Sequence, residues 1–309
     1  MRVISTSSLP IDLPAQVGAA IAGAHVEVPA AWTGVPAELA DADALVCLLL
    51  DRIDADVIRR APRLRVIANC AVGYDNVDVN AATAAGIAVT NTPDVLTEAT
   101  AEFAIALMFA AARRLPEAAQ LVRSGSWPGW RLDQLLGQPI AGRTLGIVGL
   151  GRIGRAVARR AVALGMRVIA AGHDGITLDE LFATADVISL HCPLTAETRH
   201  LVNPARLAQM KPTAILVNTA RGGCVDESAV ADAIGRGQIF GAAFDVFEAE
   251  PKVDARLRAD PRVVLAPHLG SATTEARTAM AQLCADAVIA VLSGHRPDNL
   301  VNREVTLRG

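Results

Sequence analysis

Short apolar runs rich in β-branched residues alternate along the chain with longer stretches of helical spacing. In the first part of the chain these runs predict strands at 2–6, 25–29, 44–49, 64–69 and 87–91. A helix is expected at 54–61, where Pro62 ends it. Strands that alternate with helices are typical of a parallel sheet covered by helices on both faces. We therefore predict one doubly wound unit in this part of the chain.

A long alanine- and leucine-rich helix is predicted from 96 to 115 and is expected to stop at Pro116. The turn-rich residues 124–130 predict a loop or an arm. The alternation then resumes, with strands expected at 143–148, 166–171, 187–191, 214–219, 241–247 and 263–266 and helices at 152–164, 178–183, 228–236 and 274–292. The predicted fold class is α/β, with two doubly wound parallel-sheet domains and a ligand-binding cleft between them.

Composition and charge remove several function classes. The chain has 309 residues, enough for two domains, and 52% of them are apolar, which excludes a disordered chain. The net charge is −3 and aromatic residues make up 3%, so a surface for nucleic acid is not expected. The longest apolar stretch, 103–112, is too short to cross a bilayer, and we expect no membrane partner.

The cysteines and the first residues bear on the compartment. The five cysteines are scattered, without a C-x-x-C pair or metal-ligand spacing, so we expect reduced, mostly buried thiols and no metal site. The chain turns polar and contains a proline within its first ten residues, which does not fit a signal peptide. These features predict a cytoplasmic protein.

A glycine-rich turn follows the strand predicted at 143–148. Residues 149–154 read GLGRIG, a G-x-G-x-x-G between a predicted strand and a predicted helix, which is the context of a dinucleotide-binding loop. Gly149 would permit the tight turn, Gly151 would let the backbone approach the pyrophosphate, and Gly154 would allow close packing of helix and strand. The N–H groups at the start of the helix would bind the phosphates.

Three groups of polar residues follow later strands, at the carboxyl ends where open α/β sheets bind ligands. Arg221 precedes two glycines and could present its forked guanidinium to a carboxylate. Residues 245–251 contain three carboxylates, whose repulsion implies that at least one is paired with a cation. His268 comes just after the strand at 263–266. Taken alone, the alternatives are a surface arginine, a solvated acidic loop and a structural histidine.

Taken together, these groups indicate hydride transfer to a keto acid. An arginine can hold the substrate carboxylate, and hydride delivery to a ketone carbon leaves an alkoxide that needs a proton from a nearby acid. A neighbouring carboxylate favours the protonated form of His268. The residues alone leave open which glutamate is that neighbour.

With these motifs in place, the sequence resembles the D-isomer-specific 2-hydroxyacid dehydrogenases, and within them the glyoxylate and hydroxypyruvate reductases. The resemblance runs from about residue 43 to Glu304. The matching motifs are NCAVGYDNVD at 69–78, NTPDVLT at 91–97, the glycine loop, LHCPLT at 190–195, the Arg221 cluster, Glu250-Pro251, PHLGSAT at 267–273 and LVNRE at 300–304.

The resemblance implies catalytic roles for three residues. Arg221 would bind the substrate and His268 would donate the proton. Glu250, rather than Glu248, would be the partner of His268. The expected reaction is the reduction of a small 2-keto acid, glyoxylate or hydroxypyruvate, to the D-2-hydroxy acid with a hydride from NAD(P)H.

The resemblance also implies the binding residues. The backbone N–H groups of Val72 and Gly73 would hold the substrate carboxylate. The dinucleotide would be contacted by Thr100, Arg152, Ile153, Cys192, Thr219 and Asp245, the last near the carboxamide.

The domain organisation is a further implication of the resemblance. Residues 1–95 and 286–309 would form a discontinuous, flavodoxin-like substrate-binding domain, and residues 96–285 a Rossmann dinucleotide-binding domain. Homodimers would form through the dinucleotide-binding domains.

The sequence departs from the family pattern after Gly172. Family members usually carry a further helix and strand before the helix predicted at 178–183, and the few residues here leave no room for both. NAD selectivity needs a carboxylate at the end of the second strand, but Gly172 and His173 occupy that position. We therefore favour NADP over NAD, with Asp174 as the residue that could reverse the preference.

Two other hypotheses stay open. The chain could be a non-catalytic dinucleotide sensor on the same fold, or a related dehydrogenase of another substrate such as formate or phosphite. Steady NAD(P)H oxidation with glyoxylate would exclude the first, and a substrate panel would decide the second.

Overall fold

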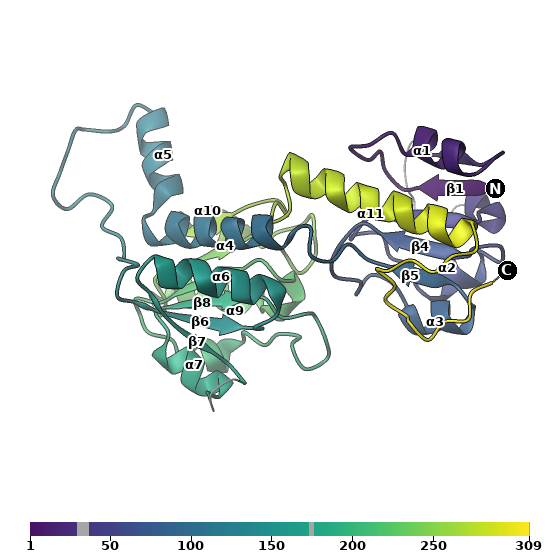
Figure 1. Ribbon diagram of the computed structural model, residues 1–309. Helices are drawn as coiled ribbons and strands as arrows, with labels where there is room; N and C mark the ends of the chain where they lie inside the picture. Colours follow the sequence, from purple (N-terminus) through teal and green to yellow (C-terminus); the bar gives the residue numbers. More distant parts are fainter. Residues whose placement is uncertain (30–36, 173–175, 309) are drawn as a thin grey trace. The chain divides into compact units, whose positions relative to one another are not determined.

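The computed structural model describes residues 1–29, 37–172 and 176–308, which divide into two compact units (Figure 1). Unit 1 comprises Met1–Leu96 and Ala272–Gly309, and unit 2 comprises Thr97–Ser271. The second crossing between units therefore lies at Ala272 rather than at 286. The reason is that helix α11 (Thr274–Leu292) packs on β3, β4 and β5 of the unit 1 sheet and on α1.

Unit 1 contains a five-stranded parallel sheet. Its strand order is β2 (His25–Glu27), β1 (Arg2–Ser5), β3 (Ala44–Cys47), β4 (Val66–Asn69), β5 (Ala88–Thr90). Helix α11 packs on β3, β4 and β5, and α1 (Leu13–Ala20) packs beside it (Figure 1). The opposite face carries α2 (Ala55–Arg59), α3 (Val79–Ala84) and the 3-10 helix η1 (Ala37–Asp41) over a buried aliphatic core.

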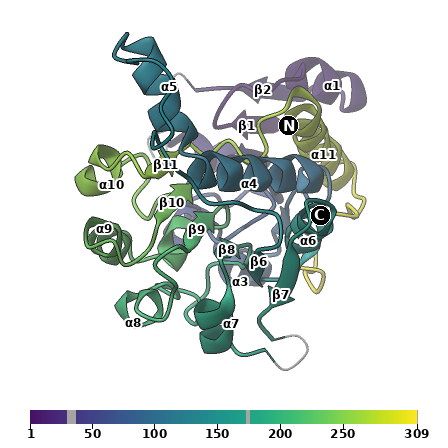
Figure 2. The same cartoon turned by 90° about the vertical axis from the view of Figure 1, so that its left-hand side faces the viewer.

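Unit 2 contains a six-stranded parallel sheet. Its strand order is β11 (Val263–Leu265), β10 (Gly241–Phe244), β9 (Ile215–Asn218), β8 (Val187–Leu190), β6 (Thr144–Val148), β7 (Arg167–Ala170). One face is covered by α4 (Thr97–Ala112) and α6 (Arg152–Ala163). The other is covered by α7 (Leu178–Thr184), α8 (Pro204–Leu207), α9 (Glu227–Gly235) and α10 (Ala255–Ala259) (Figure 2). The predicted α/β class with two doubly wound sheets is confirmed.

The strand order of unit 2 fixes where a ligand can bind. The first strand, β6, has β7 on one side and β8 on the other. Helix α6 follows β6 on one face of the sheet, whereas α8 follows β8 on the other. The chain therefore diverges at the carboxyl ends of β6 and β8, which is the topological switch point where open α/β sheets bind ligands.

The helix predicted from 96 to 115 is wrong at its end. Helix α4 stops at Ala112, and Arg114 takes a left-handed backbone conformation with φ of 52°. A second helix, α5 (Leu115–Arg123), then begins with Pro116 in its first turn. A proline there loses no hydrogen bond, because the first N–H groups of a helix have no partner within it, so Pro116 starts a helix instead of ending one.

Helix α5 and the residues after it lie away from the sheet of unit 2 (Figure 1). All nine residues of α5 are exposed or half-buried. Large apolar side chains are exposed both in α5 and in the segment between α5 and β6: Leu115 and Val122 in the helix, and Trp127, Trp130, Leu132 and Leu136 after it. We call residues 115–136 the arm.

Within the described ranges, none of the helices combines the length and the apolar character needed to cross a membrane.

Candidate active site

The carboxyl edge of the unit 2 sheet collects most of the predicted site residues. Because all six strands are parallel, the residues that follow them lie along one edge. In the order of the strands from β11 to β7 they are His268, Asp245, Thr219 with Arg221, Cys192, the loop 149–154, and Gly172. His173 lies outside the described residues.

The glycine loop has a geometry that fits a dinucleotide. Gly149 has φ of 96°, and a Cβ there would lie 2.5 Å from the Cys192 nitrogen. A Cβ on Gly154 would lie 2.2 Å from the Gly149 carbonyl oxygen, so both positions need glycine. At Gly151, by contrast, no atom of the described residues lies within 4 Å of an added Cβ. Gly151 caps α6 without a side-chain hydrogen bond from the described residues, so space and N–H groups for a phosphate are present.

His268 forms a hydrogen-bonded pair with Glu250. The Nδ1 atom lies 3.0 Å from Oε2 and 3.2 Å from Oε1 of that carboxylate. An ionised carboxylate only accepts hydrogen bonds, so the proton is on Nδ1 and Nε2 is left for another partner. Burial acts to raise the pKa of Glu250, but the hydrogen bond and charge of His268 and the charge of Arg221 hold that pKa below its usual value.

The other glutamate of the acidic loop has a different partner. Glu248 Oε1 lies 2.7 Å from His200 Nε2 and 3.8 Å from the Arg199 guanidinium. Both glutamates thus have a cationic or potentially cationic neighbour, and the turn at 247–251 separates them. The carboxylate beside His268 is Glu250.

The backbone around Arg221 is fixed by close contacts. The Asn218 side chain donates to the Arg221 carbonyl oxygen at 2.9 Å, and Arg221 Nη1 donates to the Ala220 carbonyl oxygen at 2.8 Å. A Cβ on Gly222 would lie 1.8 Å from the carbonyl carbon of Phe247. The loop that carries Arg221 therefore lies directly against the loop that carries Glu250.

The remaining dinucleotide candidates fall along the same edge. Thr100 lies in the first turn of α4, and its Cγ2 atom is 3.3 Å from the position of a Cβ on Gly270. Cys192 is buried beside Gly149, and Arg152 and Ile153 begin α6. Gly172 is exposed, with φ of 77°.

The loop after β4 in unit 1 has two backbone N–H groups of interest. The Asn91 side chain donates to the Val72 carbonyl oxygen at 2.7 Å, and the Asn69 side chain donates to the Gly73 carbonyl oxygen at 2.8 Å. Within the described part of unit 1, no residue accepts the N–H of Val72 or Gly73. Both carbonyl groups are held by amides, so this loop presents donors that can bind an anion.

Comparison with known proteins identifies the family. The family model of the D-isomer specific 2-hydroxyacid dehydrogenase, NAD binding domain, matches residues 105–270. A relative from Thermococcus onnurineus, named glyoxylate reductase, is 51% identical over 281 residues, which cover 86% of this chain and 84% of that protein. The chain belongs to the D-isomer specific 2-hydroxyacid dehydrogenase family.

Solved structures agree with this family assignment. The TT0316 protein of Thermus thermophilus has a TM-score of 0.90 and 46% identity, and the match covers 97% of this chain and 100% of that one. The NADPH-dependent glyoxylate/hydroxypyruvate reductase of Sinorhizobium meliloti was solved with NADP and malonate. Its TM-score is 0.87 at 34% identity, and the match covers 100% of this chain and 98% of that one.

Two residues of this 2-hydroxyacid dehydrogenase were missed by the sequence analysis. His191 lies after β8, with Nε2 2.8 Å from Ser189 Oγ and Nδ1 3.5 Å from Thr219 Oγ1. Burial lowers the pKa of His191 from 6.5 to about 4, so it is neutral at working pH. Glu227, at the start of α9, is only 8% exposed. The LHCPLT motif contains His191, but nothing in its spacing signals burial, and an acid in a first helical turn normally lies in solvent.

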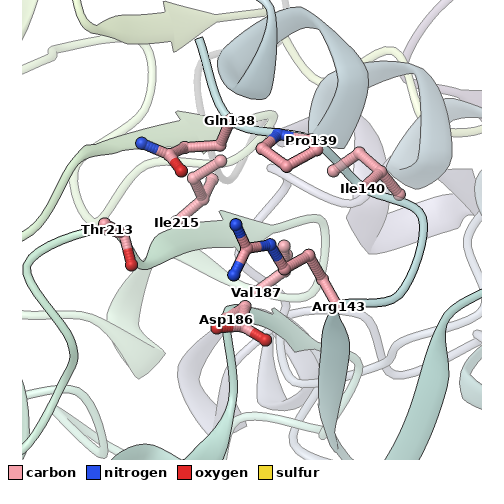
Figure 3. A pocket seen from close by; sticks show the side chains of 8 residues that line it. All are labelled: Gln138, Pro139, Ile140, Arg143, Asp186, Val187, Thr213 and Ile215. Atoms are coloured by element: carbon pink, nitrogen blue, oxygen red, sulfur yellow. The ribbon is translucent and has the colours of Figure 1, made fainter.

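A small cavity in the dehydrogenase lies at the opposite, amino-terminal edge of the unit 2 sheet (Figure 3). Its volume is about 10 Å³, room for about one water molecule. Asp186 in its lining already accepts from Lys211 Nζ and from the Thr144 N–H, each at 2.8 Å. This cavity therefore does not compete with the carboxyl edge as a ligand site.

Proposed function

We propose that this dehydrogenase reduces small 2-keto acids, glyoxylate and hydroxypyruvate, to D-2-hydroxy acids with a hydride from NAD(P)H. The observation that carries the proposal is the hydrogen bond of 3.0 Å between His268 Nδ1 and Glu250, on the sheet edge that also holds the glycine loop. The names of the Thermococcus and Sinorhizobium relatives, and the NADP and malonate of the latter, support the same reaction.

His268 would supply the proton. A bound NAD(P)H supplies the hydride to the carbonyl carbon. The carbonyl oxygen then needs a proton, and Nε2 of His268 is the ring atom that Glu250 leaves available. The Glu250 carboxylate keeps the ring oriented and stabilises its protonated form before the transfer.

The substrate carboxylate would be bound by a cation and by backbone donors. Arg221 offers a planar, forked guanidinium next to the Glu250 loop. The N–H groups of Val72 and Gly73 would supply the other hydrogen bonds to that carboxylate. Small keto acids are proposed because the motifs at 69–78 and 300–304 resemble those of the glyoxylate and hydroxypyruvate reductases.

The dinucleotide would be held along the carboxyl edge of unit 2. Its pyrophosphate would bind at the N–H groups of the loop 149–154, where the open side of Gly151 leaves room. The other proposed contacts are Thr100, Arg152, Ile153, Gly172, Cys192, Thr219 and Asp245.

The test is a set of initial rates on glyoxylate, hydroxypyruvate, pyruvate and phenylpyruvate, each with NADH and with NADPH. We expect the two small acids, glyoxylate and hydroxypyruvate, to have the highest kcat/KM. Phenylpyruvate turning over faster than both would contradict the substrate class. Absence of NAD(P)H oxidation with every keto acid would favour a sensor or another dehydrogenase.

We propose a modest preference for NADPH. The strand β7 ends at Ala170, and Gly172 follows it without a carboxylate that would bind a ribose 2′-OH and repel a 2′-phosphate. We expect kcat/KM to be higher with NADPH. A ratio of NADPH to NADH below about one-tenth, or 1.4 kcal/mol, would overturn the preference.

We also propose a homodimer that covers the arm. Trp130 and Leu132 are 80% and 81% exposed, and this much apolar surface on one segment marks an interaction site. Light scattering on the purified protein is expected to give twice the chain mass. Replacement of Trp130 and Leu132 by glutamate is expected to give monomers, and a wild-type monomer would rule the dimer out.

The proposed compartment is the cytoplasm. In the described residues all five cysteines are buried and none forms a disulfide, which suits a reducing compartment. Cell fractionation tests this, and recovery in an extracellular or membrane fraction would contradict it.

A further inference from the structure

We propose that Glu227 is a positioning residue for the reaction: its buried carboxylate fixes the loop that carries Glu250, and so fixes the carboxylate behind His268. This inference rests on the proposed proton transfer by His268. In this proposal Glu227 contacts neither the substrate nor the dinucleotide, and it acts on the reaction through Glu250.

The carboxylate of Glu227 holds both ends of one short segment. Its Oε1 atom accepts from the Glu248 N–H at 2.6 Å, and its Oε2 atom lies 3.5 Å from the Asp254 nitrogen. Glu250 lies between these two points. The side chain thus spans the base of the loop 248–254 and limits how far its backbone can move.

The burial of Glu227 shows that this contact is more than a surface hydrogen bond. The residue is 8% exposed, and a buried carboxylate is stable only when hydrogen bonds replace its water. It does not serve as the helix cap, because Asp226 caps α9 by accepting from the Ala229 N–H at 2.9 Å. Its hydrogen-bonding capacity is therefore directed at the loop.

A second contact ties the same loop to Arg221. The backbone of Gly222 lies so close to Phe247 that a Cβ would approach its carbonyl carbon to 1.8 Å. Phe247 in turn donates its N–H to Glu250 Oε1 at 2.9 Å. Gly222 and Glu227 therefore contact the loop on two sides and limit the movement of its backbone, and Glu250 of this loop contacts His268.

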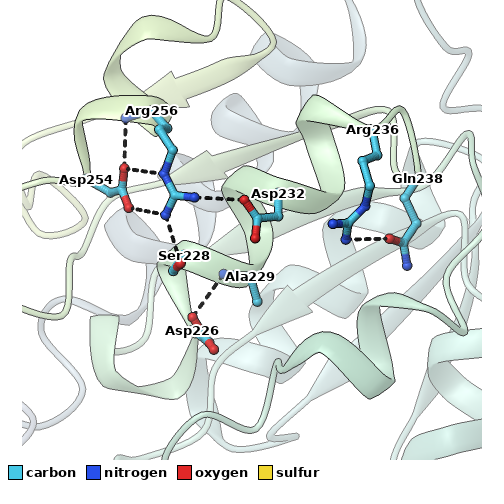
Figure 4. Close-up of polar contacts among 8 residues, drawn as sticks. All are labelled: Asp226, Ser228, Ala229, Asp232, Arg236, Gln238, Asp254 and Arg256. Atoms are coloured by element: carbon cyan, nitrogen blue, oxygen red, sulfur yellow. Dashed lines mark hydrogen bonds and ion pairs between the residues drawn. The ribbon is translucent and has the colours of Figure 1, made fainter.

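The outer side of this region provides a matched control. Arg256 of α10 binds Asp254 at 2.8 Å and Asp232 of α9 at 2.7 Å, and it donates to Ser228 at 2.8 Å (Figure 4). Asp232 is an acid of the same helix, and its partner Arg256 also binds Asp254, but the Asp232 side chain is 51% exposed. Exposed ion pairs contribute little to stability, so Asp232→Asn should leave the site unchanged.

Loss of the Glu227 carboxylate should lower kcat and leave the binding of glyoxylate and NADPH almost unchanged. With its base released, the loop can shift, and Glu250 then stabilises the protonated His268 less well. We expect Glu227→Ala to lower kcat about tenfold and to move the alkaline limb of the pH–rate profile to lower pH. Glu227→Gln should have a smaller effect, since its amide oxygen can still accept one N–H. The KM for glyoxylate and the Kd for NADPH should stay within about twofold.

The experiment compares E227A, E227Q, D232N, E250Q and the double variant E227A/E250Q, all as full-length chains. The readouts are kcat and KM across pH, the Kd for NADPH and the melting temperature. In the E250Q background, E227A is expected to cause no further shift of the alkaline limb, because its effect passes through Glu250.

Three results would overturn the inference. The first is a pH–rate profile of E227A equal to that of the wild type. The second is a shift of the alkaline limb by E227A in the E250Q background as large as its shift in the wild type. The third is a loss of kcat in D232N equal to that in E227A. If E227A does not fold, E227Q is used instead. An alkaline limb and a kcat equal to those of the wild type in E227Q would then contradict the inference. An inactive wild type would instead refute the proposed reaction, so the two failures are distinguishable.

Discussion

The Asp245 carboxylate accepts hydrogen bonds from the two backbone N–H groups that follow His268. They come from Leu269 at 2.6 Å and from Gly270 at 2.7 Å. The His268 N–H itself donates to the Asp245 carbonyl oxygen at 2.8 Å. His268 has φ of 56°, a left-handed conformation that is uncommon for a side-chain-bearing residue, and these three bonds hold it there.

The first prediction follows from this arrangement. Asp245→Asn places an NH₂ group against one of the two N–H donors, so one hydrogen bond is lost and the His268 loop shifts. We expect kcat to fall about tenfold. In a His268→Ala background the same substitution should change kcat little, since both act on one group. A loss confined to the Kd for NADPH would assign Asp245 to the dinucleotide alone.

His268→Ala and Arg221→Ala should fail in different ways. Removal of the proton donor should lower kcat by about 10²–10⁴-fold and leave the Kd for NADPH unchanged. Removal of the guanidinium should raise the KM for glyoxylate and also lower kcat, together by about 10–100-fold in kcat/KM. Steady-state kinetics and dinucleotide titration separate the two. Near wild-type kcat in His268→Ala would end its role as the acid.

Glu250→Gln should change the pH dependence of reduction. The pKa of Glu250 lies below its usual 4.5, so the carboxylate stays ionised across neutral pH and its support of protonated His268 is lost only as pH falls through that lowered value. A neutral amide removes this support at every pH. The alkaline limb of kcat/KM should therefore move to lower pH. An unchanged profile would contradict the pairing of Glu250 with His268 in catalysis.

Two alanine substitutions in the glycine loop should separate folding from binding. Gly154→Ala forces a Cβ to within 2.2 Å of the Gly149 oxygen and should destabilise unit 2 by about 3 kcal/mol. Gly151→Ala meets no described atom within 4 Å, so the melting temperature should hold while the KM for the dinucleotide rises about tenfold. Thermal melts and kinetics on both variants check this. Equal KM values for wild type and Gly151→Ala would place the phosphates elsewhere.

His191 should make stability depend on pH. Its pKa is lowered by burial from 6.5 to about 4, so between these values the unfolded chain binds more protons than the folded one. Stability is full above about pH 6.5 and falls as pH drops, by about 2 kcal/mol between pH 7.5 and 5.0. His191→Gln should flatten this part of the curve. Urea midpoints at the two pH values test it, and an equal drop in the variant would assign the loss to other groups.

Helix bounds could be predicted from the sequence where residues at the helix end itself set them. Helix α11 has the predicted bounds of 274–292, since Thr273 caps it by accepting from the Ala276 N–H at 3.1 Å. Before α7, Thr177 and Glu180 form a capping box, and their spacing of three residues is the local pattern that such a box requires. Pro116 misled the prediction because a proline both ends one helix and suits the first turn of the next.

The parts that sequence reasoning could not supply depend on contacts between distant residues. Glu248 and Glu250 look alike in sequence, and the turn between them directs one to His200 and the other to His268. The half-buried position of His191 and the burial of Glu227 likewise result from packing that no local pattern encodes. The left-handed backbone of His268 depends on Asp245, more than twenty residues earlier in the chain.

The short connection after β7 has a consequence for the surface of unit 2. Strand β7 is the last in the sheet order, so one side of it has no strand partner among the described residues. An open strand edge can pair with another chain and start aggregation. Here the strand has four residues, and its exposed Arg167 holds the hydroxyl of Thr144 at 3.0 Å. Natural edge strands are kept unpaired by their short length and by charged side chains, and β7 has both features.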